Sequence, residues 1–219
     1  MNEIVCETCL RIGRRADEVR LMGVSKFFPR SAVEEAKTAG LVLFGESRVQ
    51  EAETKFPDLV ESNIELHLIG SLQRNKVKRA LALFSMIESV DRNELIDELG
   101  KLTAEQEKTL KVLLELNSGE VQKAGFRSEP ELFEAMEKIA LYRGLNVCGL
   151  MTIAPNTEDK KIVRKAFRRL AIIRQKIAKD FPQYDFSILS MGMSGDYTIA
   201  IEEGSTLIRV GTAIFGERF

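Results

Sequence analysis

The feature that most constrains the fold is a regular alternation of short apolar segments with amphipathic helical segments along the whole chain. Nearly continuous apolar runs are typical of parallel strands that are buried on both faces, and parallel strands require a crossover, usually a helix, between them. Eight such units in 219 residues predict a closed (β/α)8 barrel, a TIM barrel, forming a single domain over residues 1–219. An open, doubly wound sheet is the alternative. The expected strands are 19–26, 41–47, 64–70, 84–90, 108–119, 145–153, 186–192 and 206–216.

Residues that begin and end helices separate these apolar segments. Ser31 and Glu34 have the spacing of a capping box and predict that a helix begins at Ser31. Asp91 is the expected N-cap of a helix that ends near Gly100. Residues 2–16 are expected to be helical and to cover the outer wall of the barrel, because no full helical segment follows the last strand.

Composition and charge exclude several functional classes. The net charge of −1 gives no general reason to expect nucleic acid or an anionic membrane as a partner, and the basic helix over 161–179 is interpreted as a solvated outer helix. No apolar run has the length of a membrane span, and the charged N-terminus lacks the apolar segment of a secretory signal. Three cysteines, with no second Cys or His pair near Cys6 and Cys9, predict neither a disulfide framework nor a metal site. These observations favour a protein of the reducing cytoplasm.

Barrel geometry predicts where the chemistry lies. Reactive groups in such barrels occupy the C-terminal ends of the strands, and phosphate often binds to the loops after strands 7 and 8. Lys26 ends the first strand, behind the apolar run Leu21–Val24. A lysine at the tip of a buried strand loses solvation, which lowers its pKa and frees its amine for Schiff-base chemistry. The alternative is a lysine that extends its ammonium group into water.

The last two strands carry the other candidate residues. Ser190 begins a loop of small and hydroxyl-bearing residues, which could bind an anion or could simply form a turn capped by Ser194 or Asp196. Arg209 and Gly211 alternate with Val210 and would share one face of strand 8. Gly211 lets a ligand approach the backbone, and Thr212 offers a hydroxyl group beside it. A buried Arg209 would require an acidic or ligand partner.

An amine, an anion cup and a buried cation together describe a ligand with an aldehyde, a phosphate and a basic ring nitrogen. Pyridoxal 5'-phosphate (PLP) has these three features. The protein is then expected to bind and tune a cofactor that carries the chemistry.

The sequence resembles the YggS/PROSC family of pyridoxal phosphate homeostasis proteins from about Val19 to Phe219. The resemblance implies the PLP fold type III, which is like the N-terminal domain of alanine racemase. It also implies that Lys26 forms the Schiff base (internal aldimine), that Ser190, Gly211 and Thr212 bind the phosphate, and that Arg209 faces the pyridine nitrogen. The blocks that carry it are Val24-Ser25-Lys26, FGESRVQE (44–51), HLIGSLQRNKV (67–77), IESVD (87–91), KAGF (123–126), GLMTI (149–153), SMGMSGD (190–196) and GSTLIRVGTAIFG (204–216).

One position departs from the family pattern, and it bears on the cofactor site. The family usually has Asn where this chain has Ser47, at the end of the second strand, and a hydroxyl group there replaces a carboxamide. Ser47 is thus a weaker candidate contact to the cofactor than the five residues above.

The resemblance favours a PLP carrier without catalytic turnover. An arginine at the ring nitrogen keeps that nitrogen unprotonated, which makes the ring a weak electron sink. His67, the single histidine, is interpreted as a hydrogen-bonded structural residue. The resemblance implies a monomer that holds PLP and delivers it to acceptor enzymes. The alternatives are a PLP-dependent amino-acid racemase or lyase and a cofactor-free aldolase.

Overall fold

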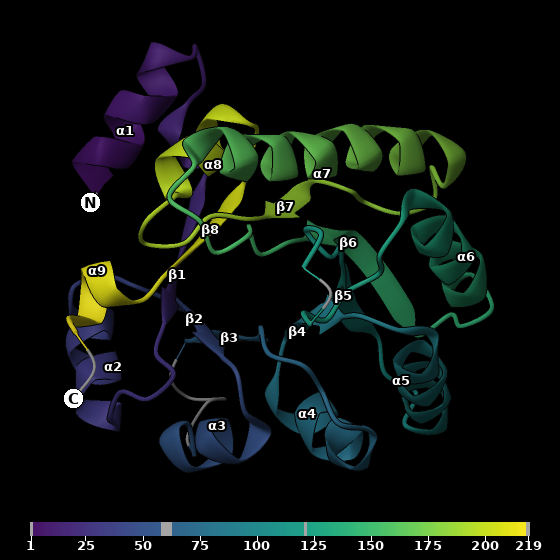
Figure 1. Ribbon diagram of the computed structural model, residues 1–219. Coiled ribbons are helices and arrows are strands. Elements are labelled where there is room, and N and C mark those ends of the chain that lie inside the picture. Colours follow the sequence, from purple (N-terminus) through teal and green to yellow (C-terminus); the bar gives the residue numbers. More distant parts are fainter. Residues whose placement is uncertain (1, 58–62, 121, 218–219) are drawn as a thin grey trace.

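The eight strands form one closed barrel in which every neighbouring pair is parallel and follows chain order (Figure 1). This computed structural model describes residues 2–57, 63–120 and 122–217. The closed order confirms the predicted TIM barrel and excludes the open doubly wound sheet, which would leave two unpaired edges. The strands are β1 (Arg20–Val24), β2 (Leu43–Glu46), β3 (Glu65–Leu68), β4 (Met86–Val90), β5 (Leu110–Glu115), β6 (Leu145–Met151), β7 (Ile188–Ser190) and β8 (Leu207–Val210).

Helices surround the barrel and pack their apolar faces on the outward side chains of the strands (Figure 1). Two short 3-10 segments, Ala16–Glu18 and Arg74–Lys76, precede β1 and the fourth helix. The α-helices in the described ranges are α1 (Asn2–Arg11), α2 (Arg30–Thr38), α3 (Val49–Lys55), α4 (Val77–Leu83), α5 (Asn93–Glu105), α6 (Glu129–Ile139), α7 (Lys160–Asp180), α8 (Tyr197–Glu202) and α9 (Thr212–Phe215). No helix in the part of the chain described above is long and apolar enough to cross a membrane.

Two predicted helix caps are wrong. Helix α2 begins after Pro29, whose φ of −70° suits the start of a helix, so Ser31 lies inside the first turn and does not cap it. Arg92 precedes α5 in an extended conformation, so Asp91 is not its cap. Helix α5 also continues past Gly100 to Glu105. A Cβ atom at Gly100 would lie 2.2 Å from the ring of Tyr142, so this glycine serves close packing and does not end the helix.

The last predicted strand is too long. Strand β8 ends at Val210 because Gly211 leaves the extended conformation (φ −110°, ψ −82°), and the one-turn helix α9 follows it. The predicted N-terminal helix is confirmed: α1 packs beside α8, and its Val5 and Cys9 share an apolar cluster with Ile208 of β8 (Figure 1). The outer face of β8 is thus covered by a helix from the N-terminal end of the chain.

The barrel lumen contains two apolar clusters and a set of polar side chains from β3, β4, β7 and β8. Met22, Val24 and Leu43 form one apolar cluster, and Met86 and Leu113 belong to a second on the opposite side. Side chains alternate along each strand, so Arg209, which pairs with Met22 in the β1–β8 register, also points into the lumen. The interior of this barrel therefore contains fixed charges below the mouth at which cofactors bind.

Candidate functional site

Lys26 lies two residues beyond the end of β1, at the C-terminal mouth of the barrel. Met22 and Val24 point into the lumen, whereas the hydroxyl group of Ser25 donates outward to Glu46 at 2.8 Å. Alternation along the chain thus directs Lys26 toward the lumen, and its side chain is half-buried. Because β1 pairs with β2 and β8, Lys26 lies next to the loops that follow those two strands.

The loop after β7 meets the turn after β8 beside the end of β1. The Ser194 hydroxyl oxygen accepts the N–H groups of Gly211 at 3.3 Å and Ala213 at 3.5 Å. These long contacts leave both N–H groups weakly bonded and able to donate to an anion. A Cβ atom on Gly211 would approach protein atoms no closer than 3.4 Å, at the Val24 carbonyl oxygen. Packing within the protein therefore does not require a glycine at this position.

Arg209 is a buried cation, with 4% of its surface exposed. Its guanidinium donates to the Ser190 hydroxyl group at 2.6 Å and to the Thr152 carbonyl at 2.8 Å. Burial lowers the pKa of Arg209, and the nearby carboxylates of Glu88, Glu115 and Asp196 act in the opposite direction. The guanidinium group is the strongest base among the side chains, so Arg209 is treated as a cation.

Below Arg209, a chain of ionisable side chains crosses the lumen to the other end of the barrel. The buried Glu88 carboxylate accepts the Ser190 hydroxyl group at 2.5 Å and contacts the His67 ring at 2.6 Å. The other ring nitrogen of His67 lies 2.8 Å from Glu65, which also bonds Arg20 at the strand starts. We call this set the lumen column; its members are Arg20, Glu65, His67, Glu88, Ser190 and Arg209.

The geometry of the lumen column indicates a charged imidazole. Both ring nitrogens of His67 face carboxylate oxygens, which can only accept, so both nitrogens must carry protons. Burial alone would lower the pKa of His67, but the hydrogen bonds to Glu65 and Glu88 raise it above the ordinary value. The hydrogen bond from His67 lowers the pKa of Glu65 to about 2, against the effect of burial and with help from Arg20. This confirms the interpretation of His67 as a hydrogen-bonded residue.

Glu115 adds a second carboxyl group near the mouth, at the end of β5. Its side chain is buried. The pKa of Glu115 is raised to about 7, chiefly by burial and also by the neighbouring Asp91, whereas Arg209 and Lys123 act in the opposite direction. A carboxyl group with this pKa can exchange a proton near neutral pH.

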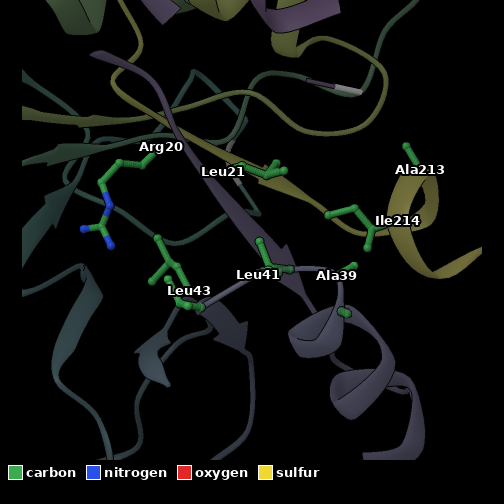
Figure 2. Close-up of a pocket in the computed structure, with 10 residues that line it drawn as sticks. Arg20, Leu21, Ala39, Leu41, Leu43, Ala213 and Ile214 are labelled. Atoms are coloured by element: carbon green, nitrogen blue, oxygen red, sulfur yellow. The ribbon is translucent and has the colours of Figure 1, made fainter. Parts of the chain in front are cut away.

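Ser47 lies at the end of β2 and lines a cavity of about 220 Å3 together with Leu68 and Lys76. Gly70 allows the strands to meet there, since a Cβ atom on it would lie 2.4 Å from the Ser47 carbonyl oxygen. A second cavity, of about 430 Å3, lies outside the lumen between β1, β2, α2 and α9 (Figure 2). Among the described residues that line this outer cavity, Arg20 alone is charged and the others are apolar or glycine, so the lining offers a phosphate one cation and no side-chain hydroxyl group.

Comparison with known proteins identifies the family. The model of the alanine racemase N-terminal domain matches residues 7–218. The pyridoxal phosphate homeostasis protein of Vibrio alginolyticus is 40% identical over 213 residues, which cover 95% of this chain and 90% of that protein. The chain belongs to the pyridoxal phosphate homeostasis protein family.

Solved structures of the family and of its racemase relatives share the barrel. PipY from Synechococcus elongatus PCC7942, solved with PLP bound, is 32% identical with a TM-score of 0.85, over 97% of this chain and 100% of that one. Alanine racemase from Bacillus anthracis is 17% identical with a TM-score of 0.73, and the match covers 99% of this chain but 56% of the racemase. The racemase comparison shows the fold alone.

The structure places the residues predicted for the family's cofactor site in three locations: at the mouth of the barrel, one layer deeper in the lumen, and beside β2. Lys26, Gly211 and Thr212 lie at the mouth, and Thr212 is exposed as the first residue of α9. Arg209 and Ser190 are in direct contact one layer deeper. Ser47 lies on the β2 side of the mouth.

Glu88, Glu115 and Ser194 are parts of this site that were not predicted from the sequence. Each glutamate lies at a buried position of a mostly apolar strand, and a buried charged residue requires a partner, so the sequence does contain a signal for both. Ser194 was predicted only as part of a loop that could bind an anion or could form a capped turn, and it was not named as a ligand. Its contact with Gly211 joins two separate loops, and no local sequence pattern reports such a contact.

Proposed function

We propose that this protein binds PLP covalently through Lys26 and stores it for transfer to PLP-dependent enzymes. The observation that carries this proposal is the buried cation Arg209, which Ser190 and Thr152 hold on the strand next to β1, two residues before Gly211. PLP, when bound, supplies an aldehyde that reacts with amines and an electron-withdrawing pyridine ring. The name shared by the relatives and the PLP bound to PipY support the same conclusion.

The residues at the mouth fit the phosphate group of this cofactor. The Gly211 and Ala213 N–H groups and the Ser194 and Thr212 hydroxyl groups can all donate to phosphate oxygens. Ser190 was expected to join them, but its buried hydroxyl group donates to Glu88 and accepts from Arg209. This geometry favours Ser194 as the phosphate ligand and gives Ser190 the role of holding Arg209.

Arg209 is suited to face the pyridine nitrogen. Its guanidinium is held by Ser190 and Thr152 and cannot act as an acceptor, so it favours an unprotonated ring nitrogen. The ring then withdraws electrons weakly, which favours storage over turnover. We place Ser47 in a lesser role, on the β2 side of the cofactor.

The decisive test locates the bound cofactor. The protein as purified is expected to absorb visible light, and borohydride reduction followed by mass spectrometry is expected to find the modification on Lys26. Lys26→Ala should abolish the visible band. Lys123→Ala is the matched control, because Lys123 also lies near the mouth but contacts the Ala154 carbonyl instead. An unchanged band in Lys26→Ala would refute Lys26 as the attachment point.

Storage and delivery require a separate test. We propose a cytoplasmic monomer that transfers PLP to acceptor enzymes. The loaded protein is mixed with a cofactor-free PLP enzyme in the presence of an amine that traps free PLP. Activation of the acceptor despite the trap supports delivery, whereas activation that the trap abolishes shows only release into solution.

Glu115 favours a second candidate function, that of a PLP-dependent amino-acid racemase or lyase. Its carboxyl group, with a pKa of about 7, lies near Arg209 and can accept or donate a proton at neutral pH. Amino acids are incubated with the loaded protein in deuterated water. Exchange at the α carbon that exceeds the rate with free PLP, and that Glu115→Gln removes, would favour the enzyme over the carrier.

A further inference from the structure

The turn that carries Lys26 has an unfavourable backbone conformation. The Phe28 N–H donates to the Ser25 carbonyl at 3.0 Å, which closes a four-residue turn with Lys26 second and Phe27 third. Phe27 has a φ of +70°, which matches the third position of a type II turn, where glycine or asparagine is usual. A bulky side chain there costs free energy, so other contacts must hold the turn in place.

A buried ion cluster outside the barrel wall makes those contacts. Its members are Glu46 at the end of β2 and Glu51 and Lys55 on α3, and we call them the outer ion cluster. The Lys55 ammonium donates to Glu46 at 2.7 Å and to Glu51 at 2.9 Å, and its side chain is almost fully buried. Helix α3 packs against the outer side of β2, so the outer ion cluster lies outside the barrel wall, on the side opposite to the lumen (Figure 1).

Each member of the outer ion cluster bonds a residue beside Lys26. Lys55 donates to the Ser25 carbonyl at 2.7 Å, and Glu46 accepts the Ser25 hydroxyl group at 2.8 Å. Glu51 accepts the N–H of Phe27 at 2.6 Å. The residues on both sides of Lys26 are therefore fixed to this cluster, Ser25 through Glu46 and Lys55, and Phe27 through Glu51.

Stability alone does not account for the outer ion cluster. Burying charges in a protein costs solvation energy that their mutual attraction often fails to recover. Oxygen Oε2 of Glu46 is buried without a hydrogen-bond partner among the described residues, and burial raises the pKa of this carboxyl group against the effect of Lys55. Replacing a buried ion pair with well-packed apolar residues is often neutral or stabilising, so the charges are better explained by the turn that they hold.

We propose that Glu46, Glu51 and Lys55 are positioning residues for Lys26: they hold the strained turn so that the amine points into the lumen. Without them, Phe27 returns to a negative φ, the peptide planes beside Lys26 rotate, and the amine leaves the line toward the Arg209 layer. The proposal rests on the proposed attachment of PLP to Lys26, but its first test does not use the cofactor.

The first test measures amide hydrogen exchange in the cofactor-free protein. Lys55→Met removes the ammonium group and keeps much of the side-chain volume. We expect exchange at the Phe28 amide, which closes the turn, to accelerate by about tenfold or more, with no change at Leu113 in β5. Equal exchange at Phe28 in the variant and the wild type would overturn the proposal, whatever the protein does with PLP.

The second test asks whether relief of the strain replaces the cluster. PLP is mixed with cofactor-free protein, and the rate of attachment is followed by visible absorbance. Lys55→Met is expected to slow attachment by about tenfold, and Phe27→Asn in the same background to restore most of it, because asparagine tolerates a positive φ. Phe27→Ala is the matched control and should restore nothing, since alanine keeps the steric cost without the ring.

Equal recovery with asparagine and alanine would overturn the proposal, because it would trace the defect to the Phe27 ring and not to the turn. No recovery with asparagine would overturn it as well. If Lys55→Met does not fold, Glu51→Ala replaces it, because Glu51 is partly exposed. Its loss removes the acceptor for the Phe27 N–H and one of the two carboxylates that Lys55 contacts, and leaves the Lys55–Glu46 pair in place. A wild-type protein that never attaches PLP would refute the proposed function and leave the exchange test to decide on the cluster.

Discussion

Glu88 is the residue of the lumen column whose replacement has the most calculable effect. Its two carboxylate oxygens accept from different donors, the His67 ring on one side and the Ser190 hydroxyl group on the other. Glutamine has the same shape, but its side chain has one oxygen and one NH2 group in place of two oxygens. In Glu88→Gln, the NH2 group therefore faces another donor, either the His67 ring or the Ser190 hydroxyl group. The Ser190 hydroxyl oxygen could accept from the amide as well as from Arg209, but its own proton would then lose the Glu88 acceptor.

The energetic cost of Glu88→Gln follows from the hydrogen bond that the amide group cannot make. A hydrogen bond to a charged group contributes about 1.5–3 kcal/mol, and a buried donor left without a partner costs about 1–3 kcal/mol more. Removing one partner of a buried ion pair costs about 3–5 kcal/mol in measured cases. The isosteric change keeps the packing and one acceptor, so we expect Glu88→Gln to lower the free energy of unfolding by about 3 kcal/mol.

Urea unfolding of the cofactor-free protein at neutral pH measures this difference directly. The matched control is Glu129→Gln, which breaks a pair with Lys176 at 2.8 Å whose side chains are 34% and 53% exposed. Such surface pairs contribute about 0–1 kcal/mol. If Glu88→Gln changes stability by no more than Glu129→Gln does, the lumen column is not an ionised network and the reasoning fails.

Three further outcomes are expected. Because the pKa of Glu115 is raised to about 7 in the folded protein, that state holds the proton more tightly, and stability should fall by on the order of 3 kcal/mol as pH rises from the ordinary value of 4.5 to about 7. Glu115→Gln should flatten this part of a plot of the unfolding midpoint against pH, and an unchanged slope would contradict the assignment. Gly211→Ala should alter stability by less than about 0.5 kcal/mol yet weaken PLP binding about tenfold, since its methyl group enters the phosphate cup. Thermal unfolding measures the first effect and titration with PLP the second. An unaltered affinity for PLP would argue against phosphate at this turn. Gly149→Ala should cost about 3 kcal/mol or more, because Gly149 has a φ of +151° and a Cβ atom would lie 1.8 Å from the Ile188 carbonyl oxygen; a near-normal melting temperature would show that β6 and β7 can move apart there.

The fold could be predicted from sequence because its signal is repeated. Each of the eight apolar segments contains an observed strand, and a single error in one segment does not change the closed order. The errors lie at boundaries, where a tertiary contact decides. Gly100 resembles a helix end until Tyr142 packs over it, and the apolar residues after Gly211 resemble a strand until the backbone turns.

The site could be predicted only in part, because it consists of two kinds of residue. Lys26 and Arg209 follow from rules about strand ends and alternation, which depend on nearby residues only. The partners of Arg209 come from β7 and from the residue after β6, and Glu88 reaches Ser190 across the lumen. Such contacts depend on the register of each strand relative to its neighbours in the barrel. The periodicity of apolar residues does not predict that register.

The enclosed position of His67 makes the barrel interior observable by spectroscopy. It is the single histidine of the sequence, so any imidazole signal in a nitrogen-labelled sample belongs to the lumen column. Both ring N–H protons are hydrogen-bonded and shielded from water, so they should exchange slowly and give two resolved proton resonances far from the amide region. The resonance of the nitrogen that faces Glu88 would shift when a ligand repositions Arg209, and the one that faces Glu65 would respond to changes at the opposite end of the barrel. A single residue would thereby report separately on the two ends of the lumen.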